Sequence, residues 1–234
     1  MPNNSIATYP SYAFRQCIKL STVVIPSGTQ NIYSYMFYEC RSLSNVIIPR
    51  SVLKIDSRSF YNCYSLINIT IPDTTNISSY AFNNCYLLNN IQIAESVTKI
   101  DSYTFNGCYS LLNINMPEDI KSIYSYAFYN CYSLLNIKIP NEVTSIESSA
   151  FGYCYSLLKI TIPSKVTSIG NSVFYSDCNL KEIHLRPTTV PTCGTNVFYG
   201  ISSDYIIYVP YSSDHSILEA YKTASNWSAY ASHM

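Results

Sequence analysis

The chain has 234 residues, of which only 12% are charged, about half the usual share for a soluble domain. Lysine plus arginine and aspartate plus glutamate are equal at 14 each, so the chain is neutral and lacks the basic signature of nucleic-acid binding. No run of 18 apolar residues is present to span a membrane, and no charged start followed by an apolar run marks a signal peptide.

A phenylalanine recurs about every 23 residues along the chain. The series is Phe14, Phe37, Phe60, Phe82, Phe105, Phe128, Phe151, Phe174 and Phe198. A fixed period of this length means that each unit is a small piece which cannot bury its apolar face alone. Stacked neighbours then share one continuous core. The period therefore predicts a single elongated solenoid, with one short step of 22 residues before Phe82.

Each unit predicts two short strands and a turn in a fixed order. Counting from the phenylalanine as position zero, cysteine stands at position three, leucine at six, and aliphatic residues at nine and eleven. This alternation predicts a strand with those side chains inward, and a proline usually ends it. A Val-Thr-x-Ile stretch, as at 143–146, predicts a second extended piece on the opposite side. The Ala-Phe-x-x-Cys segment is expected to turn the chain back.

The C-terminal part of the chain predicts a cap for the last unit. The strand pattern stops after Pro210, and 214–222 predict a short amphipathic helix with Ser213 or Asp214 as its N-cap. Trp227, the only tryptophan, is expected to fold back over the last unit. The first unit shows no comparable cap, so we expect the natural protein to continue upstream. The predicted boundaries are 1–210 for the repeat array and 211–234 for the cap and tail.

The nine cysteines admit three interpretations. Seven share one inward position of the repeat: Cys17, Cys40, Cys63, Cys85, Cys108, Cys131 and Cys154. Neighbours in this ladder would be close enough for disulfides, but their Cβ vectors point the same way rather than converging. A linear ladder also fails to offer the tetrahedral ligand set of zinc. We therefore expect these seven cysteines to act as small, buried apolar residues. Cys178 and Cys193 lie outside the ladder and are the one pair considered for a disulfide.

The residue types of catalysis are sparse. His184, His215 and His233 are the only histidines, and none has a neighbour that suggests a triad or a metalloenzyme. Six glycines are scattered and form no phosphate-binding loop. We predict that the chain is not an enzyme and that it holds no cofactor and no metal.

The outward positions eight and ten of the predicted strands are the candidate protein-binding residues. They are Asn45, Ile47, Asn68, Thr70, Asn90, Gln92, Asn113, Asn115, Asn136, Lys138, Lys159 and Thr161. Asparagine recurs five times in succession at position eight, although it is a poor strand former. One interpretation is a polar recognition strip. The other is an amide ladder in which each asparagine bonds the next along the stack, and the two are compatible.

Tyrosine, with 24 residues, forms two further series. One directly follows the cysteines, and we call it the aromatic ridge: Tyr64, Tyr86, Tyr109, Tyr132 and Tyr155. The other precedes the phenylalanines by two residues: Tyr12, Tyr35, Tyr80, Tyr103 and Tyr126. Stacked phenol rings would shield the edges of the core. The alternative is an interaction ridge, because tyrosine is an effective contact residue.

The unit Ala-Phe-x-x-Cys-x-x-Leu-x-x-Ile-x-Ile-Pro resembles the short-repeat, BspA-type subclass of leucine-rich repeat proteins over nearly the whole chain. Departures are local: Ala94 and Arg186 replace the proline, and the ninth unit has Ile201 for cysteine and Asp204 for leucine. The resemblance implies an all-β repeat solenoid, a right-handed superhelix of about nine coils with a small helical C-terminal cap. It also implies a microbial cell-surface or secreted protein.

These expectations combine into a functional hypothesis. We predict a non-catalytic protein-binding module of an extracellular or cell-surface adhesin. Its strand positions would contact host or neighbouring-cell proteins, such as extracellular-matrix proteins, with no nucleic acid and no membrane insertion. The alternative is a structural spacer or self-associating stalk, for which apolar Val24 and Ile47 near the N-terminal end suit a contact between copies.

Overall fold

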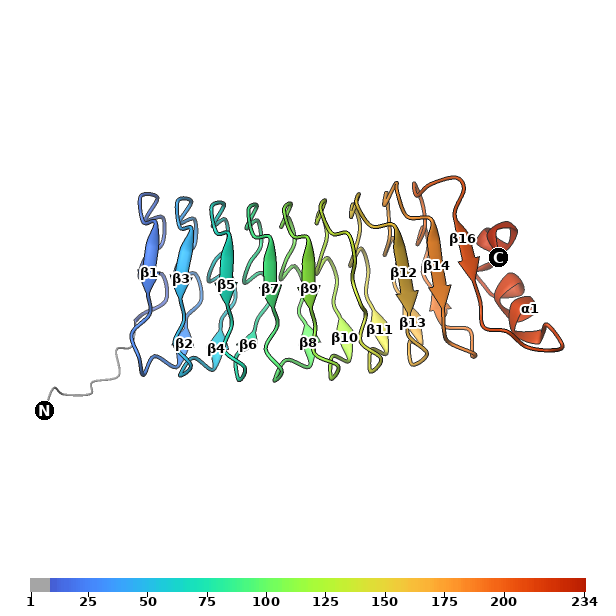
Figure 1. Cartoon of the computed structure of the whole chain (residues 1–234), viewed down its shortest axis with the longest axis horizontal. Coiled ribbons are helices and arrows are strands. Elements are labelled where there is room, and N and C mark those ends of the chain that lie inside the picture. The colour runs from blue at the N-terminus through green and yellow to red at the C-terminus, as the bar shows by residue number, and fades with distance from the viewer. Residues whose placement is uncertain (1–8) are drawn as a thin grey trace, which may run out of the picture.

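The computed structural model describes residues 9–234 as a row of stacked coils that ends in two short helices (Figure 1). Each coil adds parallel strands to two sides of the row. The first side holds β1 (Thr22–Val24), β3 (Asn45–Ile47), β5 (Asn68–Thr70), β7 (Asn90–Gln92), β9 (Asn113–Asn115), β12 (Lys159–Ile162), β14 (Glu182–Leu185) and β16 (Ile206–Tyr208). The second side holds β2 (Asn31–Ile32), β4 (Lys54–Ile55), β6 (Asn76–Ile77), β8 (Lys99–Ile100), β10 (Ser122–Ile123), β11 (Ser145–Ile146), β13 (Ser168–Ile169) and β15 (Thr192–Cys193).

The pairing register follows the repeat. Asn90 pairs with Asn113 and Ile91 with Ile114, each residue meeting its equivalent one unit later. The predicted repeat solenoid is therefore confirmed.

Strand pairing is interrupted once on each side within the described residues. On the second side the break lies between β6 and β8. The step that is one residue short lies one coil earlier, between β4 and β6, and those two strands stay paired, so the short step does not account for this break. On the first side residues 136–139 form no strand, and a five-stranded sheet ends at β9 before a three-stranded one begins at β12. The residue types at 136–139 match those of the neighbouring strands, and nothing in them explains this second break.

The core is a stack of identical side chains. Successive phenylalanine rings from Phe14 to Phe198 lie nearly parallel, with centroids 5.3 to 5.7 Å apart. The rings from Phe37 to Phe174 are fully buried, as are the leucines at position six from Leu43 to Leu180. The inward positions of phenylalanine and leucine are thus confirmed. The offset stacking of the phenylalanine rings adds to the stabilisation that comes from burying apolar surface.

The turn segments around the phenylalanines form backbone hydrogen bonds from one coil to the next, as the strands do. The Phe105 N–H, for example, donates to the Ala127 carbonyl of the next coil at 2.9 Å. Each turn also holds residues in the left-handed region, such as Tyr103 and Tyr126 at φ 59°. Non-glycine residues adopt this region at a cost, which the repeated bonding of the turns offsets.

The core cysteines are donors as well as apolar fillers. Each thiol from Cys40 to Cys154 donates to the phenylalanine carbonyl of the preceding coil, at 2.9 to 3.4 Å. Burial raises the pKa of the Cys40 thiol to about 12. All nine cysteines are free, and Cys178 is exposed while Cys193 is buried. The structure therefore contains no disulfide between Cys178 and Cys193, the pair that the sequence left open.

The C-terminal cap consists of α1 (Ser216–Thr223) and the 3-10 helix η1 (Ser228–His233). His215 is the N-cap residue, in place of the predicted Ser213 or Asp214, although the Asp214 carboxylate accepts a hydrogen bond from the Ser216 N–H at 3.0 Å. Trp227 is fully buried beside Phe198, and its Nε1–H donates to the Pro191 carbonyl at 2.8 Å. The predicted covering role of Trp227 is confirmed. The exact boundary between array and cap stays a prediction.

Helices long and apolar enough to cross a membrane are absent from residues 9–234.

Candidate protein-binding face

The outer surface of the first-side strands is called the strand face below. Because side chains alternate along a strand, positions eight and ten point outward here while positions nine and eleven enter the core. Eleven of the twelve candidate residues are exposed and Thr161 is half-buried. The structure therefore places them on one surface, as the repeat predicted. Their role in binding stays a prediction.

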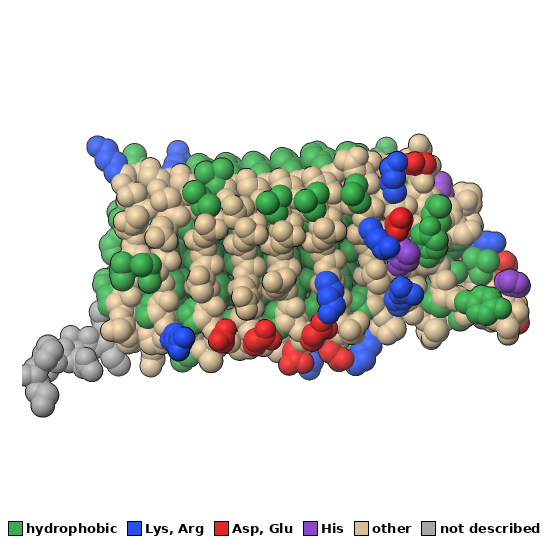
Figure 2. Space-filling view, viewed as in Figure 1, with side chains coloured by type: hydrophobic (Ala, Val, Ile, Leu, Met, Phe, Trp, Pro, Cys, Tyr) green, Lys and Arg blue, Asp and Glu red, His purple; other side chains and the backbone are tan. Residues whose placement is uncertain are grey.

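The strand face changes chemistry along its length (Figure 2). Near the N-terminal end it is apolar, with Val24 67% and Ile47 55% exposed. Uncharged polar side chains follow over β5, β7 and β9. Charged side chains gather where Lys159 and Glu182 begin β12 and β14. At β16 the face is apolar again, with Ile206 47% and Tyr208 43% exposed.

An open hollow of about 310 Å³ lies over the middle of the strand face, and we call it the amide hollow. Its polar lining is Asn68, Thr70, Asn90, Gln92, Asn113 and Asn115. No hydrogen bond joins the position-eight asparagine side chains of successive coils within the described residues; Asn90 instead donates to its neighbour Asn89 at 3.1 Å. The amide ladder is therefore wrong here, and these amides stay available to solvent or to a ligand.

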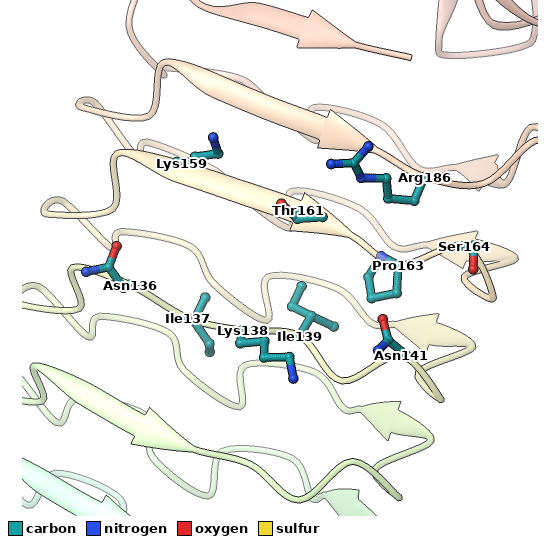
Figure 3. A pocket seen from close by; sticks show the side chains of 10 residues that line it. All are labelled: Asn136, Ile137, Lys138, Ile139, Asn141, Lys159, Thr161, Pro163, Ser164 and Arg186. Atoms are coloured by element: carbon teal, nitrogen blue, oxygen red, sulfur yellow. The ribbon is translucent and has the colours of Figure 1, made fainter. Parts of the chain in front are cut away.

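A second hollow of about 740 Å³ lies over the interruption in the first-side sheets, and we call it the basic hollow (Figure 3). It is lined by Asn136, Ile137, Lys138, Ile139, Asn141, Lys159, Thr161, Pro163, Ser164 and Arg186. Four of these are predicted site residues. Arg186, Asn141 and Ser164 are polar lining residues that sequence reasoning missed. Only Arg186 carried a signal, as the residue that replaces the expected proline.

Ion pairs order two of the three cations in the basic hollow. Lys138 pairs with Glu118, and Lys159 pairs with Glu182 at 2.9 Å. The hydrogen bond from Lys138 lowers the pKa of the Glu118 carboxyl, and that from Lys159 lowers the pKa of Glu182. Arg186 is exposed and forms no ion pair with any described residue.

The aromatic ridge is a continuous stack. Its ring centroids from Tyr64 to Tyr155 are 4.5 to 4.9 Å apart. Burial raises the pKa of Tyr86 to about 12. The other tyrosine series stacks likewise, with the Arg58 guanidinium between Tyr35 and Tyr80 where a ring is missing. These contacts agree with the expected structural role, while a binding role of the ridge stays a prediction.

Catalytic arrangements are not found in residues 9–234. His184 contacts Glu182 at 3.2 Å and stacks on Tyr208, and His233 stacks on Tyr205. No described serine or cysteine side chain bonds to a histidine, and no group of three or more His, Cys, Asp or Glu side chains is placed to hold a metal ion.

Parallel coils with a ladder of leucine, phenylalanine and cysteine define a leucine-rich repeat solenoid. The family model for the BspA type leucine rich repeat region matches residues 2–85 and 75–204. The chain belongs to this family, whose repeats generally mediate protein–protein interaction and whose fold is generally non-catalytic.

Solved structures of bacterial leucine-rich repeat proteins are similar to the chain. One from Bacteroides ovatus is 24% identical with a TM-score of 0.69, covering 86% of this chain and 63% of its own. A leucine-rich cell surface protein from Faecalibacterium prausnitzii is 27% identical with a TM-score of 0.55, and the match covers 92% of this chain and 66% of that protein. The T. pallidum leucine-rich repeat protein is 26% identical with a TM-score of 0.57, and the match covers 60% of this chain and 68% of that protein.

The chain thus spans less than two thirds of the first two structures. No curated protein matches it significantly in sequence.

Proposed function

We propose that this chain is a non-catalytic protein-binding module of a microbial cell-surface or secreted protein, and that the strand face carries the contacts. The observation that carries the proposal is the row of exposed side chains on one face of the molecule, where two open hollows lie. Open hollows with convergent polar groups are the usual form of a binding site. The similarity to a cell surface protein of F. prausnitzii supports the location.

Binding to purified extracellular-matrix and cell-surface proteins tests the proposal. We expect saturable binding to at least one of them. We also expect a variant carrying Asn113→Lys and Asn136→Glu to lose that binding while its melting temperature is unchanged, because both residues are exposed. Binding that survives both substitutions would place the contact elsewhere on the molecule.

A second candidate function is a self-associating stalk. The exposed Val24 and Ile47 favour it, since neighbouring apolar side chains on a surface suit a contact between copies. Light scattering at increasing protein concentration tests it. A strict monomer at high concentration would remove the stalk interpretation for this chain.

A further inference from the structure

The basic hollow has a chemistry that the rest of the strand face lacks. Its lining includes Lys138, Lys159 and Arg186 and no carboxylate, whereas no charged residue lines the amide hollow. The chain as a whole is neutral. Glu118 and Glu182 pair with the two lysines at the margin of the hollow, so the local excess of positive charge is that of Arg186, which forms no ion pair within the described residues. This excess favours an anionic ligand.

The three cations form a staggered row along the direction of β12. Lys159 begins that strand, and Lys138 stands one coil earlier, two positions further along the repeat. Arg186 follows β14, which pairs with β12 in register, and lies two positions further again. Each step is about 7 Å along the strand direction. Across the strands, Lys138 is also offset by one coil, about 5 Å, from Lys159 and by two coils, about 10 Å, from Arg186. An extended chain with an acidic side chain at every second residue matches the spacing along the strands, and the long lysine, arginine and glutamate side chains span the offset across them.

The floor of the hollow between these cations includes Ile137 and Ile139, whose side chains are buried in the core. Half-buried Thr161 lies between Lys159 and Arg186 (Figure 3). The main chain at 136–139 forms no backbone hydrogen bond with either neighbouring coil within the described residues. Main-chain polar groups of this kind require partners, so they add donors and acceptors beside the row of cations.

An apolar edge borders the hollow where the strands begin. Leu135 and Leu158 directly precede two lining residues and are 43% and 55% exposed, and Leu112 continues this edge one coil earlier at 39%. No aromatic side chain is among the lining residues, so the hollow offers no ring on which a sugar would stack. Leucines beside cations favour a peptide with both apolar and acidic residues over an anionic glycan.

The existing ion pairs do not block such a ligand. Exposed pairs such as those of Lys138 and Lys159 are worth about 0–1 kcal/mol, so ligand carboxylates can replace their partners at little cost. Arg186 has no such pair within the described residues, and a guanidinium can bind a carboxylate through two hydrogen bonds.

We propose that the basic hollow binds an extended acidic segment of a partner protein. An apolar residue of this segment lies over Leu135 and Leu158, and acidic side chains at alternate positions meet Lys159, Lys138 and Arg186 in turn. The proposal rests on the proposed function, because it names the partner chemistry for one part of the strand face.

A short peptide tests this proposal without knowledge of the natural partner. The probe is fluorescein-labelled Leu-Ser-Glu-Ser-Glu-Ser-Glu, and its binding is followed by fluorescence anisotropy in low salt. We expect saturable binding that weakens with added salt. We expect none for the matched peptide with glutamine in place of each glutamate.

Protein variants locate the site. Arg186→Glu should weaken binding about tenfold or more, equivalent to about 1.4 kcal/mol, and Arg186→Gln should weaken it less. Arg50→Glu is the matched control, because Arg50 is also exposed and follows a first-side strand, four coils before the basic hollow begins. Thermal melts verify that each variant is folded.

Three outcomes would overturn the proposal: no peptide binding at millimolar concentration, equal weakening by Arg50→Glu and Arg186→Glu, or binding of a sulfated oligosaccharide but not of the peptide. These outcomes leave the proposed function standing if a panel protein still binds and Asn113→Lys alone, in the amide hollow, weakens that binding. If the peptide binds as expected while no panel protein does, the basic hollow is supported and the adhesin role is not.

Discussion

At the residue scale, the core cysteines combine burial with hydrogen bonding. Cys108 is fully buried and its thiol donates to the Phe82 carbonyl at 3.3 Å. The sequence predicted the burial of seven cysteines from their repeat position, and this is confirmed for the six from Cys40 to Cys154 but wrong for Cys17, which is exposed. It did not predict the thiol hydrogen bond, which depends on the carbonyl of the preceding coil.

Replacing such a cysteine should therefore destabilise the protein. We expect Cys108→Ala to lower the free energy of unfolding by about 1–3 kcal/mol, since both the hydrogen bond and apolar volume are lost. The midpoint of urea denaturation measures this. Cys17→Ala is the matched control, because Cys17 occupies the same repeat position but is exposed. Equal midpoints for the two variants would contradict a role for the buried thiol.

Asp177 takes the place of the cysteine in the eighth unit. Its side chain is fully buried, Oδ1 accepts the Cys154 N–H at 2.6 Å, and Oδ2 has no hydrogen-bond partner within the described residues. Burial raises the pKa of this carboxyl well above its ordinary value of 3.8. The shift of cysteine to position 178 was visible in the sequence. A buried carboxyl in its place was not, because aspartate is rarely buried.

This raised pKa links stability to pH. Above about pH 4 the unfolded chain releases the Asp177 proton while the folded protein retains it, so the free energy of unfolding falls as pH rises toward the folded pKa. We expect Asp177→Cys to remove this dependence and to raise stability at pH 7 by about 1–3 kcal/mol. Thermal melts between pH 4 and pH 7 test it.

The control for this pH series is Asp119→Cys, which changes an exposed carboxyl and should leave the melting curve near that of the unmodified chain. An unchanged pH dependence in Asp177→Cys would show that Asp177 is ionised in the folded protein.

At the scale of elements, the cap protects the last coil. Trp227 packs against Phe198 and lies edge-on to Tyr221, with ring centroids 6.3 and 5.2 Å apart. We expect Trp227→Ala to cost about 3–5 kcal/mol locally. Coils contact only their neighbours, so faster hydrogen exchange should appear in β14 and β16 and not in β5 and β7.

Tyr211→Ala provides the comparison, because Tyr211 lies near the cap but is 85% exposed. It should leave exchange unchanged. A uniform rise in exchange along the whole chain after Trp227→Ala would instead mean that the array opens as one cooperative unit.

The elements also show how far the repeat pattern predicts structure. The short step before Phe82 is visible in the sequence, but the strands on either side of it, β4 and β6, stay paired. The second-side break lies one coil later, between β6 and β8, and was not predictable from the spacing. The first-side break at 136–139 was not predictable, because those residues repeat the pattern of neighbouring strands. The outward direction of the candidate residues followed from alternation alone. The two hollows did not, since their shape depends on how adjacent coils stack.

At the scale of the whole molecule, one array presents two sides of different character. The strand face holds the hollows and changes from apolar through amide to charged, and its last strand β16 is apolar again. The second side is built of shorter strands of two residues each. Because the net charge is zero, binding should depend on local complementarity and much less on long-range attraction.

The most direct measurement compares two double variants in one binding assay against a panel protein that the unmodified chain binds. One carries Asn113→Lys and Asn136→Glu on the strand face. The other carries Thr98→Lys and Thr144→Glu, exposed positions beside second-side strands, with the same charges introduced. We predict that the first variant loses binding and the second retains it, with both folded. Retained binding by the first and loss by the second would contradict the assignment of function to the strand face.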